Sequence, residues 1–61
     1  MSTLADFIGR VKIRQAKISE SLTNGVPGNF EIYQRLVGQH QGLDEALNVL
    51  NQLLEEEKHA D

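Results

Sequence analysis

The sequence contains no cysteine, and this absence removes two common means of stabilising a short chain. Disulfide bonds and thiolate metal sites are both excluded. A domain of 61 residues buries only about 60% of the surface that its unfolded chain exposes, which leaves the fold marginally stable. We therefore expect stability to come from regular helix packing or from association with further chains.

The sequence also has no long hydrophobic run. No apolar stretch approaches the roughly 18 residues that are needed to span a bilayer, so we expect no membrane contact. The segment from Met1 to Asp6 lacks a basic stretch followed by an apolar one, which argues against a secretory signal. With 39% hydrophobic residues, 25% charged residues and a single proline, the composition is typical of a soluble helical protein.

An excess of positive charge is lacking as well, since the formal net charge is −3. This value argues against nucleic-acid binding, except for contacts inside a larger assembly. Residues 1–28 carry four cations and two carboxylates, a net of +2, whereas residues 29–61 carry two cations and seven carboxylates, a net of −5. Halves of opposite sign can attract each other within one chain or between chains.

Two segments with helical periodicity flank one cluster of helix-breaking residues, at 24–29. Gly25 supplies a positive φ, Pro27 fixes φ and lacks an amide donor, and the asparagines tolerate left-handed geometry. The sequence therefore predicts a helix over about 3–23, a turn over 24–29 and a helix over about 30–58. A short turn makes the helices antiparallel neighbours, so we expect an all-α fold, a single helical-hairpin domain over residues 1–61.

The ends of both expected helices carry residues suited to capping. Thr3 followed by Asp6 resembles a capping box at the start of the first helix. Gly25, after Asn24, suits a left-handed cap at its end. Asn29 is expected to cap the second helix.

The expected first helix has a main apolar stripe that is interrupted by Arg14 and Gln15. Its apolar members fall within about 100° of the helix circumference: Leu4, Phe7, Ile8, Val11, Ile18 and Leu22. A second face carries Ala5, Gly9, Ile13 and Ala16. Gly9 costs about 1 kcal/mol relative to alanine, which indicates either a close backbone neighbour or a tolerated surface glycine.

The expected second helix has the clearest pattern in the chain. Its apolar seam is spaced 3-4-3-4-3-4 over three heptads: Tyr33, Leu36, His40, Leu43, Leu47, Leu50 and Leu54. Further apolar residues are expected to widen this seam: Phe30, Ile32, Val37, Ala46 and Leu53. We therefore expect this helix to be buried over more than a third of its circumference, which exceeds what a two-helix hairpin needs.

Gly38 and Gly42 lie four residues apart within this helix, and Ala46 continues the same row. Two glycines inside a helix cost about 2 kcal/mol relative to alanine. One interpretation is that the missing side chains let another helix approach closely. The alternative is a kink or break of the helix near Gly42.

The two helices differ in length, about 31 Å against about 45 Å. The last third of the second helix is therefore expected to outrun the first, leaving Leu50, Leu53 and Leu54 as an exposed apolar end. We expect a homo-oligomer, either a dimeric four-helix bundle or a larger ring, to cover it. The alternatives are that these leucines dock on a different protein, or that the last turns fray, which the acidic run at 55–57 favours.

Three basic residues lie along one side of the first helix, namely Arg10, Arg14 and Lys17. With no aromatic residues interleaved, we interpret them as an internal or subunit-facing charge complement, with phosphate contact as the alternative. In the antiparallel register Arg10 is expected within reach of Asp44 or Glu45.

The sequence offers no arrangement of residues suited to catalysis, and we expect no enzyme, no cofactor and no metal site. There is no Ser–His–Asp set and no phosphate-cradling glycine loop. His40 lies in the apolar seam, where we interpret it as a polar residue that sets the register. The alternatives are a metal ligand across a symmetry axis and a pH-sensitive group.

The stretch from Tyr33 to Glu57 resembles the C-terminal half of small helical proteins encoded by tailed bacteriophages. The shared pattern is a tyrosine, Gly-x-x-x-Gly-Leu-x-x-Ala-Leu, and a leucine followed by acids. This resemblance implies a phage origin and carries over no catalytic residues.

Two functions follow as hypotheses. The first is a virion or assembly component that self-associates or docks on a capsid, portal, neck or tail protein. The second is a small regulator that inhibits a host enzyme or defence protein in the host cytoplasm. The candidate interface residues are Tyr33, Leu36, Gly38, His40, Gly42, Leu43, Ala46, Leu47, Leu50, Leu53 and Leu54.

Overall fold

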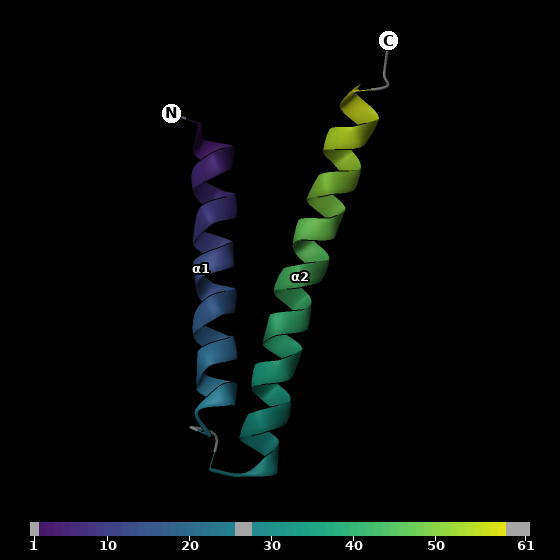
Figure 1. The fold of residues 1–61 in the computed structure, drawn as a ribbon. Coiled ribbons are helices and arrows are strands. Elements are labelled where there is room, and N and C mark those ends of the chain that lie inside the picture. Colours follow the sequence, from purple (N-terminus) through teal and green to yellow (C-terminus); the bar gives the residue numbers. More distant parts are fainter. Residues whose placement is uncertain (1, 26–27, 59–61) are drawn as a thin grey trace.

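A computed structural model of the chain describes residues 2–25 and 28–58. It contains two helices, α1 (Thr3–Thr23) and α2 (Phe30–Lys58), which run antiparallel and pack as a hairpin (Figure 1). The all-α hairpin with a longer second helix is as expected from the sequence. The two helices lie closest near the turn and diverge toward the free ends (Figure 1).

The helix ends show which backbone groups the flanking side chains satisfy. The cap of α1 is Ser2 and not Thr3, because the Ser2 hydroxyl oxygen accepts a 3.2 Å hydrogen bond from the Ala5 amide. The expected capping box at Thr3 is therefore wrong by one residue. At the other end, the Asn24 amide donates to the carbonyl of Glu20 at 2.9 Å, and Gly25 adopts the left-handed φ of 70° that ends the helix.

The start of α2 is capped as predicted. The Asn29 side-chain oxygen accepts a 2.9 Å hydrogen bond from the Ile32 amide, which satisfies one of the free amides of the first turn. From there α2 runs without interruption through Gly38 and Gly42 to Lys58. The alternative of a break in the helix near Gly42 is therefore wrong, and α2 is continuous through both glycines.

The two helices meet along one narrow seam. From α1 it holds Ile8, Val11, Gln15, Ile18 and Leu22, which are spaced 3-4-3-4, and from α2 it holds Leu36, His40, Leu43, Leu47, Leu50 and Leu54. Gln15 is half-buried and fills the position where the apolar stripe is interrupted, so the seam is continuous in space. Among the described residues only Ile18, 7% exposed, is fully buried.

The hairpin is too extended to be a compact domain. Its radius of gyration is 14.8 Å, whereas a compact chain of this length has about 10.5 Å. It exposes 5118 Å² of surface, about 1,100 Å² more than the roughly 4,000 Å² of a compact monomer of this mass. Two helices enclose one line of contact, and the remaining circumference of each helix stays in solvent.

Candidate interaction surface

Large apolar side chains are exposed on both helices. They are Leu4, Phe7, Ile13, Phe30, Ile32, Tyr33, Val49 and Leu53. Two of them form a stacked pair at the start of α2, where the ring centroids of Phe30 and Tyr33 lie 6.4 Å apart. Exposed apolar surface of this extent on a small protein is typical of an interaction surface.

One exposed row runs along α2, outside the seam. Its members are spaced 4-4-3-4, and we call them the outer row: Gly38, Gly42, Ala46, Val49 and Leu53. Ala46 and Leu53 were expected to widen the seam toward α1, but both are exposed, and Leu53 is 50% exposed. The reason is geometric, because two helices contact over a narrow strip and the width of the apolar face of α2 exceeds it.

The glycines of the outer row are open to solvent within the hairpin. Across the described residues, apart from the adjoining residues and the backbone of the same helix, nothing lies within 4 Å of a Cβ built at Gly38 or Gly42, and the same holds for Gly9 on the far side of α1. The close approach that these glycines permit is therefore not made by the other helix of the same chain. Any such contact requires another molecule.

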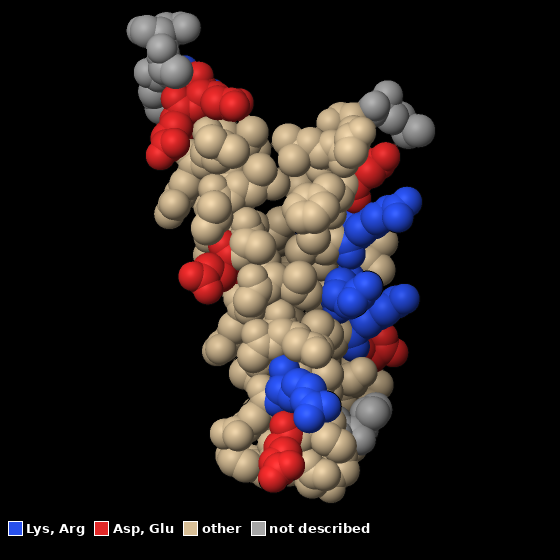
Figure 2. Space-filling model, turned by 180° about the vertical axis from the view of Figure 1, so that it is seen from behind, with Lys and Arg blue, Asp and Glu red and all other residues tan. Residues whose placement is uncertain are grey.

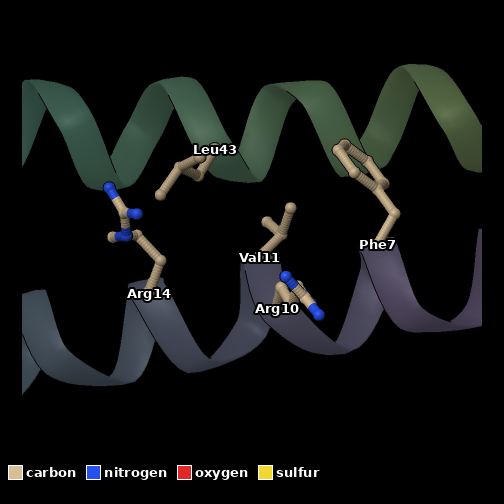
Figure 3. Close-up of a pocket in the computed structure, with 5 residues that line it drawn as sticks. All are labelled: Phe7, Arg10, Val11, Arg14 and Leu43. Carbon is tan, nitrogen blue, oxygen red and sulfur yellow. The ribbon is translucent and has the colours of Figure 1, made fainter.

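The first groove between the helices lies beside the outer row. It encloses about 270 Å³ and is lined by Phe7, Arg10, Val11, Arg14 and Leu43. Phe7 and Val11 point toward α2, Leu43 points back toward α1, and Arg14 reaches across to α2 (Figure 3). We call the side of the hairpin that holds this groove the arginine face.

The outer row borders the arginine face. Around α2, Gly42, Ala46 and Leu53 lie about 60–100° from Leu43. They lie on the side away from Val37 and Gln41, which line a second groove, of about 260 Å³, on the opposite face of the hairpin. The arginine face therefore combines Phe7 and three of the four basic side chains of α1, Arg10, Arg14 and Lys17, with the small and apolar side chains of α2. It also includes Arg35, which lies in line with Leu53 on α2.

Charge is divided unevenly between the helices: α1 carries four cations and two carboxylates, and α2 carries two cations and six carboxylates. In the view from behind, basic side chains follow α1 along one edge, and acidic side chains gather at the far end of α2 (Figure 2). The expected pairing of Arg10 with Asp44 or Glu45 is absent, since within residues 2–25 and 28–58 Arg10 forms no ion pair. The opposite charges of the two helices are therefore not neutralised by an Arg10 ion pair inside the hairpin.

The C-terminal end of α2 differs in part from the expectation of an exposed leucine cluster. Leu53 is exposed, but Leu50 and Leu54 are half-buried and lie on the seam with the same heptad spacing as Leu43 and Leu47. The exposed apolar surface of α2 therefore lies mainly along its outer row. The end of α2 that extends beyond α1 contributes less to it. Tyr33, at the other end of the predicted seam, is 47% exposed.

The predicted interface residues thus divide into two sets. Leu36, His40, Leu43, Leu47, Leu50 and Leu54 are half-buried along the seam. Tyr33, Gly38, Gly42, Ala46 and Leu53 are exposed. Two exposed members of the surface were missed, Phe7 and Val49; Val49 follows Ala46 by three residues, a spacing that would have placed it in the same row.

His40 lies in the second groove with Ser19, Leu22, Val37 and Gln41. No group of three or more His, Cys, Asp or Glu side chains that could hold a metal ion occurs in the part of the chain that the structure describes. Over the same residues, neither helix combines the length and the apolar character needed to cross a bilayer.

Replacing His40 with leucine is expected to stabilise the hairpin by about 1 kcal/mol, because a half-buried apolar side chain replaces a polar one on the seam. Polar residues at seam positions of coiled coils fix the register of the helices at a cost in stability. If His40 has this role, its replacement should also let the two helices pack in more than one arrangement. Urea unfolding followed by circular dichroism measures the first effect, and the dispersion of amide signals by NMR measures the second. A destabilised His40→Leu variant would contradict this account of the residue.

No protein-family model matches this chain, and no curated protein or solved structure matches it either.

Proposed function

We propose that the chain is a non-enzymatic interaction protein of a tailed bacteriophage whose working unit is an assembly of several copies. The observation that carries this proposal is the surplus of exposed surface, about 1,100 Å² above that of a compact monomer. A typical stable interface buries about 800 Å² on each partner. The surplus is thus of the size that one interface per chain would remove.

The chemistry of the exposed surface also favours an interface. Phe7, Val49 and Leu53 are large apolar side chains that stay in solvent in the hairpin. Gly42 and Ala46 lie among them and let a further helix approach. Aromatic and aliphatic anchors around small residues are features of helix–helix contacts.

The phage setting rests on the resemblance of residues 33–57 to small phage-encoded helical proteins. In that setting the assembly docks on a capsid, portal, neck or tail protein and belongs to the virion. A second candidate, an inhibitor of a host protein, is favoured by the acidic side chains that gather at the far end of α2 (Figure 2). Such a cluster can mimic the charge of a nucleic acid.

Mass spectrometry of purified phage particles distinguishes these two functions. The proposal expects the chain in washed particles at a fixed copy number relative to the major capsid protein. Absence from particles, together with binding of one purified host enzyme that nucleic acid displaces, would favour the regulator instead.

A further inference from the structure

We propose that the occupant of the arginine face is a second copy of this chain, arranged with both turns at the same end of the dimer. This inference rests on the proposed self-association and specifies its geometry. Each α1 then packs antiparallel against the partner's α2, and the four helices form a bundle in which the two kinds of helix alternate. The opposite arrangement, with the turns at opposite ends, pairs α1 with α1 and α2 with α2.

The arginine face is the side of the hairpin best suited to this contact. It presents the exposed Phe7 from α1, which lines the groove, and the exposed Leu53 from α2, which lies about 80° around that helix from Leu43. Gly42 and Ala46 flank the same groove and leave room beside it for the side chains of an approaching helix. The groove on the opposite face is lined by Ser19, Leu22, Val37, His40 and Gln41, none of which is a large exposed apolar side chain.

Charge complementarity selects a second copy and fixes its direction. Helix α1 carries four cations and two carboxylates, a net of +2, whereas α2 carries two cations and six carboxylates, a net of −4. With the turns at the same end, each positive helix meets a negative helix of the other chain. Opposite charges at helix interfaces set partner choice and orientation.

The opposite arrangement brings like charges together. Arg10, Arg14 and Lys17 lie within about 60° of one another on the arginine-face side of α1. If the turns lay at opposite ends, these three cations would meet the same three cations of the partner in antiparallel register. Like charges that face each other across an interface destabilise it.

The distance between the two turns of the dimer tests this arrangement. A spin label attached through Gly28→Cys lies beside the turn, where the side chain has free space and φ is unexceptional. In the proposed dimer two such labels lie within roughly 30 Å, because a four-helix bundle is only about two helix diameters wide. In the opposite arrangement their separation approaches the 51 Å length of the hairpin. Pulsed electron paramagnetic resonance measures this distance in the full chain.

Charge reversal provides an independent test, with a matched control on the same helix. Arg14→Glu is expected to weaken the dimer by about tenfold, since it replaces an attraction by a repulsion at two symmetric positions. Lys12→Glu makes the same change in charge about 160° around α1 from Arg14 and is expected to change the dissociation constant less than threefold. With the turns at opposite ends, Arg14→Glu would instead strengthen the dimer.

The outcomes separate this inference from the proposed function. A monomer in sedimentation experiments overturns both. A dimer whose labelled turns lie about 50 Å apart, or whose affinity rises with Arg14→Glu, overturns only the arrangement. Adjacent turns, together with a selective loss of affinity in Arg14→Glu, establish it.

Discussion

Replacing Gly42 with leucine is expected to raise the helix content of the chain and at the same time weaken its self-association by about 100-fold or more. The first effect follows because leucine favours a helix interior over glycine by close to 1 kcal/mol, and apart from the adjoining residues and the backbone of α2 itself no described atom lies within 4 Å of the new Cβ. The second effect follows because a bulky side chain at a close helix contact costs about 1–3 kcal/mol, and a symmetric dimer contains the site twice. Circular dichroism and sedimentation equilibrium measure the two effects on one sample.

Gly9→Leu is the matched control for this change. Gly9 lies inside α1 and is equally open, so the gain in helix content should be similar. It lies about 140° around α1 from Arg14, on the side away from the arginine face, so association should be little affected. If Gly42→Leu raises helix content and leaves association intact, the arginine face is not the interface.

Replacing Ile18 with alanine is expected to lower the free energy of unfolding by about 2–4 kcal/mol. Ile18 is the one fully buried side chain among the described residues, 7% exposed, and it lies in the middle of the seam. A chain this short has only about 3–5 kcal/mol of stability from a single core, so most of the fold should be lost at room temperature. Thermal and urea unfolding followed by circular dichroism measure the change.

Ile13→Ala makes the same substitution on the same helix at an exposed position. Ile13 is 57% exposed and lies on the side of α1 away from α2. Its replacement should be close to neutral in unfolding, since alanine is the better helix former and little buried area is removed. Equal losses at the two positions would show that the seam is not where α1 and α2 pack.

Much of the fold could be predicted from the sequence, because it depends on local signals. The bounds of both helices, the cap at Asn29 and the left-handed Gly25 follow from residue types at fixed spacing. The heptad spacing of α2 also identified its contact residues from Leu36 to Leu54. One cap was predicted wrongly, because Ser2 and not Thr3 caps α1. The two residues are neighbours, and their hydroxyl side chains have similar capping preference.

The candidate surface was harder to predict, because it depends on how two helices share their apolar faces. Ala46 and Leu53 were expected to widen the seam. They lie beside it and are exposed, because α1 covers only part of the apolar face of α2. Gln15 was expected to interrupt the stripe of α1, yet it fills a seam position. Hydrophobic periodicity measures the width of an apolar face, whereas the neighbouring element decides which part of it is covered.

Sedimentation velocity of the full chain at micromolar concentrations shows whether the hairpin works as an assembly. We expect a species of at least twice the 6.8 kDa chain mass, which dissociates on dilution with loss of helix content. A single species of 6.8 kDa that remains fully helical and unfolds cooperatively at all concentrations would contradict it.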